Sequence, residues 1–102
     1  MPVALQVIYP ITEGTTFDFD YYTKTHIPMV REIVGKFIQS NMITKGLASG
    51  PDTPPGFYLI ATHVFKDMPT MQEGLALAGP VMADIANFTN VSPQMLIGEV
   101  IG

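Results

Sequence analysis

The segment Phe57–Phe65 limits the possible folds more than any other part of the sequence, because most of its residues are apolar. Side chains of a β-strand point alternately to its two faces. One face of this strand would carry Phe57, Leu59, Ala61, His63 and Phe65, and the other Tyr58, Ile60, Thr62 and Val64. A strand that is apolar on both faces belongs in the middle of a sheet.

The residues before this strand predict one further strand on each side of a helix. Val3–Tyr9 is rich in β-forming residues and ends at Pro10, and Ile43–Ser49 is the second strand, followed by a turn rich in Pro and Gly over 50–56. Between them, Asp18 is a suitable N-cap for a helix whose apolar periodicity continues to about Ser40. Pro28 should break or kink this helix, because it lacks an N–H donor and clashes with the preceding turn.

The residues after the apolar strand predict a second helix and a last strand. The helix opens near 67–70, where Thr70 and Glu73 have the spacing of a capping box. Gly79 and Pro80 interrupt it, and a short piece continues over Val81–Phe88. Met95–Ile101 is then the fourth strand.

The order strand, helix, strand, strand, helix, strand is typical of an α+β fold of the ferredoxin-like βαββαβ type. We expect a four-stranded antiparallel sheet with the first and third strands central and the helices on one face. A length of 102 residues predicts a single domain, 1–102. The other face of the sheet would be bare and apolar, so two such sheets should pack together.

Composition also favours association and excludes several classes of partner. Mean hydropathy is +0.28, yet no apolar run reaches the ~18 residues that span a bilayer, so a homodimer is the expected place for the excess apolar surface. Nine acidic and five basic residues give a net charge of −4, which argues against nucleic acid and anionic membranes as partners. The absence of Cys and of a signal-like N-terminus makes the cytoplasm the expected location.

The first helix contains the most informative residues for chemistry. Helical spacing gives one apolar stripe that should face the sheet: Phe19, Tyr22, His26, Met29, Ile33 and Phe37. A His and a Tyr one turn apart would then point inward, beside the irregularity at Pro28. An imidazole can act as an acid or base near neutral pH, and a phenol can donate a hydrogen bond to a developing oxyanion. His26 and Tyr22 are therefore the candidate catalytic residues, and Phe19 and Met29 are candidates for substrate binding.

Alternatives remain open at each of these positions. A His on an apolar stripe is equally well explained as a hydrogen-bonded core residue, and Tyr22 taken alone is better explained by core packing than by a site. His63 and Phe65 share one face of their strand, so they would line a cavity with His26 if that face meets the helices, or lie in a dimer interface if it does not. Two His on separate elements, without a carboxylate at ligand spacing, give only a weak metal signal, and we expect no metal site.

The segment from Phe19 to Met29 resembles the signature of EthD-type proteins, in which Tyr-Tyr is followed by His-x-Pro: here Tyr21-Tyr22 and His26-Ile27-Pro28. The segment Asp84–Asn90 and the ending Ile97-Gly98-Glu99-Val100 resemble the closing part of that family. The similarity extends over essentially the whole chain. It implies a dimeric α/β barrel, in agreement with the fold derived from the residues.

The resemblance implies less about activity. The wider superfamily includes cofactor-free monooxygenases, muconolactone isomerases and polyketide cyclases, several of which use His and Tyr or Asn between sheet and helices. The chain has no Trp, which makes it less similar to the haem-degrading members. Two functions follow: a cofactor-independent acid–base enzyme (lyase, isomerase or oxygenase) acting on a small aromatic, lactone or polyketide-like molecule, or a non-catalytic protein that binds such a molecule in a degradation pathway.

Overall fold

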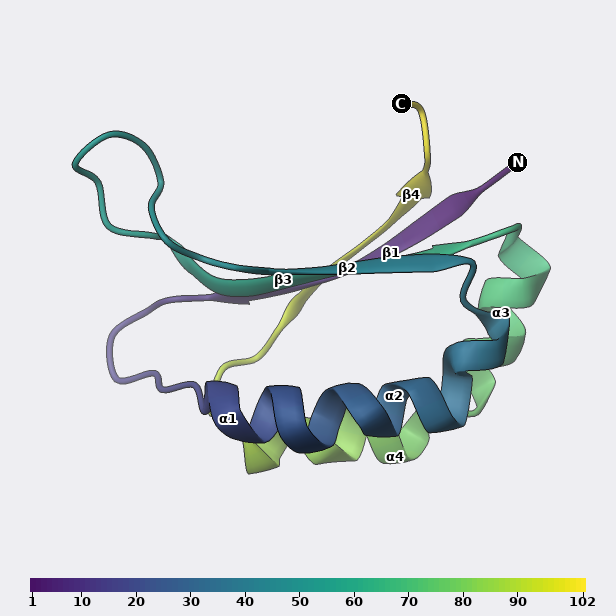
Figure 1. Cartoon of the computed structure of the whole chain (residues 1–102), viewed down its shortest axis with the longest axis horizontal. Coiled ribbons are helices and arrows are strands. Elements are labelled where there is room, and N and C mark those ends of the chain that lie inside the picture. The colour runs from purple at the N-terminus through teal and green to yellow at the C-terminus, as the bar shows by residue number, and fades with distance from the viewer.

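The computed structural model describes residues 1–102, and it contains one antiparallel sheet of four strands. The strands are β1 (Val3–Pro10), β2 (Ser40–Lys45), β3 (Phe57–Phe65) and β4 (Gln94–Glu99), in the order β2-β3-β1-β4. The α+β fold is thus confirmed, with the first and third strands in the centre. The helices within 19–37 and 79–87 cover one face of this sheet, and the helix Met68–Ala76 lies at one end of its strands (Figure 1).

The register fixes which side chains face the helices. β1 pairs with β3 so that Leu5 lies opposite His63 and Tyr9 opposite Leu59. These positions, together with Ala61 and Phe65, lie on the helix-covered side, and most of them are buried. His63 therefore faces the helices rather than the open side of the sheet.

The first helical segment does not break at Pro28, and the irregularity predicted there takes the form of a π-helical turn just before the proline. It consists of α1 (Phe19–Tyr21), a π-helical turn (Tyr22–His26), α2 (Ile27–Val34) and a 3₁₀ turn (Gly35–Phe37). Asp18 is the N-cap, as predicted, and accepts a hydrogen bond from the backbone of Tyr21 at 3.0 Å. The wider turn, closed by a bond from the amide of Ile27 to the carbonyl of Tyr22, gives the proline ring room at the start of α2.

The π-helical turn also shifts the buried stripe, and the predicted stripe is wrong at Met29 and Ile33, although Phe37 packs toward the sheet as predicted. A π turn takes up an extra residue, so every later side chain rotates around the helix axis. The cavity-facing positions after His26 are Val30 and Val34 rather than Met29 and Ile33. Met29 and Ile33 instead pack against a cluster formed by Val34 of this helix and by Ala78 and Val81 of the neighbouring helical segment.

The second strand begins earlier than predicted, at Ser40 rather than Ile43, and ends at Lys45. The helical segment finishes at Phe37, so the chain reaches the sheet sooner. The residue after the strand is Gly46, where a side chain would collide with the backbone carbonyl of Phe57. The turn that follows contains Asp52 in the left-handed region, with φ of 56°. The last strand, β4, ends at Glu99, two residues before the predicted end at Ile101.

The second helical segment is divided, as predicted, at Gly79 and Pro80. α3 covers Met68–Ala76, α4 covers Gly79–Asp84, and a 3₁₀ turn follows over Ile85–Asn87. The predicted capping box is wrong. The N-cap is Asp67, whose carboxylate accepts a hydrogen bond from the backbone N–H of Thr70 at 2.9 Å. The helix begins at the next residue, Met68, and Pro69 lies in its first turn.

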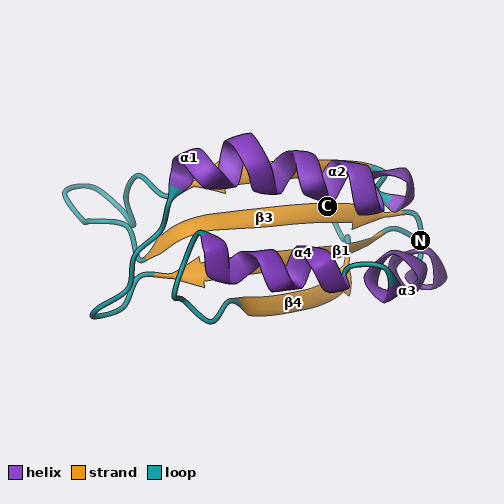
Figure 2. Ribbon diagram, turned by 90° about the horizontal axis from the view of Figure 1, so that it is seen from below, coloured by secondary structure: helices purple, strands orange, loops and turns teal.

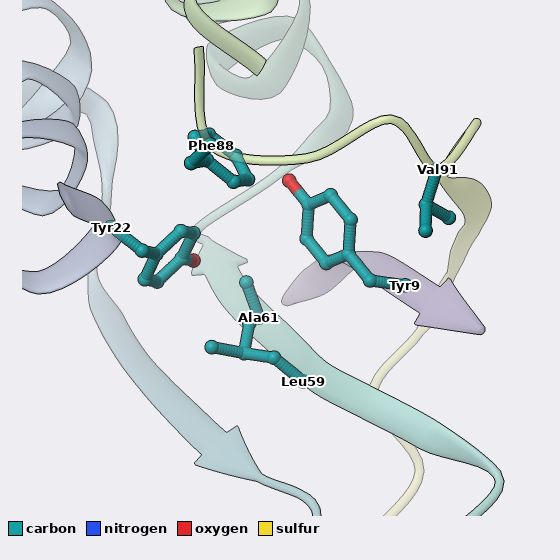
Figure 3. Packing of buried hydrophobic residues seen from close by; sticks show 6 residues of the cluster. All are labelled: Tyr9, Tyr22, Leu59, Ala61, Phe88 and Val91. Atoms are coloured by element: carbon teal, nitrogen blue, oxygen red, sulfur yellow. The ribbon is translucent and has the colours of Figure 1, made fainter. Parts of the chain in front are cut away.

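The largest group of buried apolar residues lies where α1, the end of α4 and the two central strands meet. Figure 3 shows its members Tyr9, Tyr22, Leu59, Ala61, Phe88 and Val91. Seen from the helical side, α1 and α2 lie next to α4 across the strands (Figure 2). None of these helices has the length and apolar character needed to cross a membrane.

The opposite face of the sheet is not covered within the chain. Ala4, Ile8, Ile60 and Val64 are half-buried there, while Met42 and Leu96 are 65% and 54% exposed. The loop between β2 and β3 and both ends of the chain extend to this open side of the sheet (Figure 1).

Candidate active site

An apolar cavity of about 270 Å³ lies between the sheet and the helices. Fifteen of its nineteen lining residues are hydrophobic, and none of the nineteen carries a formal charge. Its hydrogen-bonding side chains come from four residues only: Tyr9, Tyr22, His26 and His63. Binding sites for small molecules usually combine such an apolar wall with a few polar groups, in volumes from about 300 Å³ upward. The cavity therefore suits a small, mostly apolar molecule.

His26 is held in the cavity wall by a buried carboxylate. Its Nδ1 lies 2.9 Å from Oδ2 of Asp84, and both side chains are 5% exposed. The other oxygen of Asp84 accepts hydrogen bonds from the Tyr21 hydroxyl at 2.6 Å and from the Asn87 amide at 3.0 Å. His26 belongs to the first helical segment and Asp84 to the end of α4, so their contact depends on how these two neighbouring helices pack together.

These hydrogen bonds determine the charge of Asp84. Burial by itself would raise the pKa of Asp84, but hydrogen bonds from Tyr21, Asn87 and His26 outweigh it and hold the pKa below its ordinary value. The hydrogen bond to Asp84 raises the pKa of Tyr21, which keeps this phenol a donor. An ionised Asp84 accepts the Nδ1–H of His26. The lone pair of the imidazole is then on Nε2, which has no partner within the chain.

Aromatic rings fix the orientation of the His26 imidazole. The ring of Tyr22 stacks on it with centroids 5.1 Å apart and planes inclined by 29°. Phe88 meets it edge-on at 4.6 Å. Tyr22 precedes His26 by four residues, and the π-helical turn between them leaves both side chains buried on one side of the helix. Stacking and hydrogen bonding together limit the imidazole to one position.

Two phenols border the cavity next to this imidazole. Figure 3 shows their rings reaching in from different elements, Tyr22 from the first helical segment and Tyr9 from β1. Burial raises the pKa of Tyr22 to about 12. Burial, and secondarily the neighbouring Tyr22, also raises the pKa of Tyr9. Both phenols therefore stay protonated at neutral pH and can donate a hydrogen bond.

His63 and Phe65 also line the cavity, on the helix-facing side of β3. The alternative location of His63 in a sheet–sheet interface is thereby excluded. Nδ1 of His63 is buried and has no hydrogen-bond partner. Burial, together with the nearby His26, lowers the pKa of His63. This imidazole is therefore neutral at neutral pH.

Two of the six candidate residues do not reach the cavity. Met29 packs against the cluster of Val34, Ala78 and Val81 and does not line the cavity, because the π-helical turn rotates it away. Phe19 packs against Phe17, with ring centroids 4.7 Å apart, and the ammonium group of Lys45 lies 4.2 Å from its ring centre. Phe19 borders a separate, wide and open hollow of about 710 Å³ between 16–20 and 86–90, far less enclosed than the cavity and without a buried ionisable pair.

Two residues of the site escaped sequence reasoning. Asp84 continues the spacing of the buried positions Ala78 and Val81, so a carboxylate within an apolar helical stripe was the available signal. Tyr9 is the last helix-facing residue of β1 and precedes Pro10, which made it resemble an ordinary end of a strand. The sequence could not indicate that Asp84 contacts His26 or that Tyr9 lies near Tyr22 in the same cavity wall.

The comparisons with known proteins agree with this architecture. The family model described as EthD domain matches residues 14–92. An EthD-like protein from Ralstonia eutropha is 32% identical, with a TM-score of 0.88, over 99% of this chain and 93% of that one. An EthD family protein from Bacillus halodurans is 24% identical, with a TM-score of 0.70, over 99% and 100% of the two chains.

More distant structures share only the fold. SnoaB from Streptomyces nogalater, a cofactor-independent oxygenase, is 8% identical with a TM-score of 0.65, over 99% of this chain and 94% of that one. No curated protein matches the sequence. At such low identity the similarity extends to the arrangement of helices and strands and not to the reaction.

Proposed function

The chain belongs to the EthD family, and we propose that its cavity is the active site of a cofactor-independent acid–base enzyme. The substrate would be a small, mostly apolar molecule bearing a carbonyl or phenol group. The existence of a cofactor-independent oxygenase with the same fold is consistent with this proposal.

One observation supports the proposal above all others: the pairing of His26 with Asp84 at the wall of an apolar cavity. Asp84 holds the imidazole through Nδ1 at 2.9 Å, so that Nε2 is available as a base. A carboxylate that orients a histidine also stabilises the imidazolium formed when the histidine takes a proton. A histidine needed only for packing would not require an ionised partner with three hydrogen bonds of its own.

In the proposed reaction, Nε2 of His26 removes a proton from the bound molecule and later returns it. Tyr22 donates a hydrogen bond to the oxygen on which negative charge develops, since its raised pKa keeps it protonated. The apolar wall makes the surroundings of the bound molecule less polar than water and so strengthens both interactions. General acid–base catalysis of this kind contributes about 10²–10⁴-fold to the rate.

The test compares wild type with His26→Ala. A thermal-shift screen against small aromatic ketones, lactones and polyketide-like compounds first identifies ligands, because a ligand at 100 times its Kd adds about 2.7 kcal/mol of stability. Turnover of these ligands is then measured. We expect His26→Ala to lose turnover while keeping its oligomeric state, and turnover equal to wild type would contradict the proposal.

The same screen distinguishes a non-catalytic binding protein from an enzyme. A binding protein would return its ligand unchanged, with an affinity that does not vary across the range in which histidines ordinarily titrate, about pH 5–8. A purely structural His26 would give a third result. Its replacement would then reduce stability and leave ligand binding otherwise unaffected.

We further propose that the chain forms a homodimer through the open face of its sheet. This face carries Met42 and Leu96 largely exposed beside apolar residues of β1 and β3. A second copy of the same face would cover it, as the closed two-fold assemblies of small proteins commonly do. The loop between β2 and β3 extends to the same side and would lie beside the second copy.

A further inference from the structure

His63 lies in the cavity wall opposite the helices, and the acid–base step does not use it. It belongs to β3, between Leu5 of β1 and Asn41 of β2 in the sheet register. His26 affects its ionisation, so the two imidazoles share one electrostatic environment. The two histidines thus approach the same space from the sheet and from the helix.

The surroundings of His63 favour one tautomer. Its Nδ1 is buried without any hydrogen-bond partner, whereas Nε2 is not closed off in this way. A hydrogen on Nδ1 would be a buried donor without an acceptor, whereas a hydrogen on Nε2 can reach a partner in the cavity. The hydrogen of neutral His63 is therefore on Nε2. Protonating the ring would place a second, unpartnered N–H at Nδ1, which this burial opposes.

His26 has the opposite arrangement. Its Nδ1–H donates to Asp84, so Nε2 is an acceptor. The cavity is therefore bordered by two histidines with opposite roles: Nε2 of His26 accepts a hydrogen bond, and Nε2–H of His63 donates one. Such a pair can bind a neutral molecule that has an acidic hydrogen close to an acceptor oxygen.

We propose that the cavity binds an uncharged, enolisable carbonyl compound, with its carbonyl oxygen accepting from Nε2–H of His63 and its α-hydrogen facing Nε2 of His26. The inference rests on the proposed acid–base function and adds His63 as a second group that contacts the substrate. Tyr22 donates to the same carbonyl oxygen from the helical side.

The proton transfer balances without any further reactant. The α-C–H bond breaks, its hydrogen moves as a proton to Nε2 of His26, and the electron pair moves to the carbonyl oxygen to give an enolate. Nε2–H of His63 and the hydroxyl of Tyr22 hold the enolate oxygen, while Asp84 stabilises the imidazolium. Return of the proton to carbon regenerates the ketone, and return from D₂O exchanges the α-hydrogen for deuterium.

The cavity wall favours neutral ligands over carboxylates. No Lys or Arg is among its nineteen lining residues. Burying a carboxylate without a positive partner is costly, whereas a ketone needs only the two donors that are present. The volume of about 270 Å³ also suits a compound of one or two rings.

The first experiment measures the tautomers by long-range ¹H–¹⁵N NMR at neutral pH. The chain has only two histidines, so the spectrum contains two imidazoles, and His63→Gln assigns them. We expect Nδ1–H for His26 and Nε2–H for His63. Finding His63 protonated at Nδ1, or at both nitrogens, would overturn the inference and leave the proposed role of His26 intact.

The second experiment measures deuterium uptake by 2-indanone, an uncharged ketone, in D₂O. We expect His63→Leu to slow the exchange by about 10²–10³-fold, which is the usual effect of removing one donor to a developing oxyanion. His63→Gln should restore most of the rate, because its amide can donate from a similar position. A merely structural role would not give this recovery by Gln.

The outcomes separate the two proposals. Exchange by His63→Leu at the wild-type rate, with His26→Ala inactive, overturns the inference about His63 alone. Absence of exchange by wild type at saturating 2-indanone overturns both the proposed enolisation and the inference that rests on it. Equal exchange of 2-indanone by wild type and His26→Ala contradicts the proposed function itself.

Discussion

The two faces of the sheet are made from the same four strands but differ in chemistry. The helix-covered face carries His63 and Tyr9, and it meets a histidine held by a buried carboxylate. The open face carries no charged side chain, and its central polar residues, Gln6 and Thr62, hydrogen-bond to each other at 3.2 Å. The buried ionisable groups are thus confined to the covered face. At the centre of the open face the polar residues are paired with each other, which suits burial against a second copy, while the polar residues of its edge strands, Ser40, Thr44 and Gln94, are exposed.

The largest expected effect concerns the open face. Leu96→Lys should weaken the proposed homodimer by about 10²–10⁴-fold in Kd, because a two-fold interface contains the change twice and each buried Leu contributes about 1.5–3 kcal/mol. Sedimentation equilibrium over a range of concentrations measures this. The matched control is Leu77→Lys at the end of α3, since Leu77 is 49% exposed and Leu96 54%.

The two lysine variants distinguish the faces by a single measurement. Dissociation caused by Leu96→Lys but not by Leu77→Lys would place the interface on the open face. Equal dissociation constants for Leu96→Lys and wild type would remove that face as the interface. Dissociation caused by Leu77→Lys instead would move the interface to the helical side.

The second effect concerns the covered face. Asp84→Asn should lower the free energy of unfolding by about 1–3 kcal/mol, because one amide oxygen cannot accept from His26, Tyr21 and Asn87 together. Asp84 acts through His26, so kcat should fall while KM stays near the wild-type value. Urea unfolding and steady-state kinetics measure the two parts. A lower stability with unchanged kcat would make Asp84 a structural residue only.

A third effect is the dependence of stability on pH. The pKa of Asp84 in the folded protein lies below its ordinary value of 3.8, so its contribution is fully present above about pH 3.8 and disappears as the pH falls through the folded-state pKa. Between pH 5 and acid unfolding, wild type should therefore lose more stability than Asp84→Asn. Thermal unfolding of both proteins across this range measures the difference. Parallel losses would mean that Asp84 is not held ionised by its neighbours.

The sequence predicted the arrangement of the sheet because that arrangement depends on local patterns. Phe57–Phe65 is apolar on both faces, and the structure gives β3 the same bounds in the centre of the sheet. Asp18 as an N-cap and the interruption at Gly79 and Pro80 are equally local, and both are confirmed. Such features depend on neighbours within a few residues.

The parts that failed depend on contacts between distant residues. A regular α-helix would turn Met29 toward the cavity, but the π-helical turn before Pro28 adds a residue and turns Val30 and Val34 there instead. The partner of His26 lies 58 positions away, so no spacing rule could identify Asp84. The position of the helix and the identity of the imidazole could thus be predicted from the sequence, while the packing of the first helical segment beside α4 determined which carboxylate pairs with the imidazole.

The smallest effect compares two glycines, one on each side of the sheet. Gly74 is buried within α3, and a methyl group there would lie 3.4 Å from Phe37, an ordinary contact distance, whereas Gly98 in β4 has open space around it on the uncovered face. Gly74→Ala should raise the free energy of unfolding by about 0.4–1 kcal/mol, because alanine restricts the unfolded chain and favours the helix. Urea unfolding at protein concentrations where the oligomeric state is constant measures this, with Gly98→Ala as the control for a strand. A loss of stability in Gly74→Ala, with no loss in Gly98→Ala, would mean that α3 packs too closely on Phe37 to accept one methyl group, and that the covered face has less room than its contacts indicate.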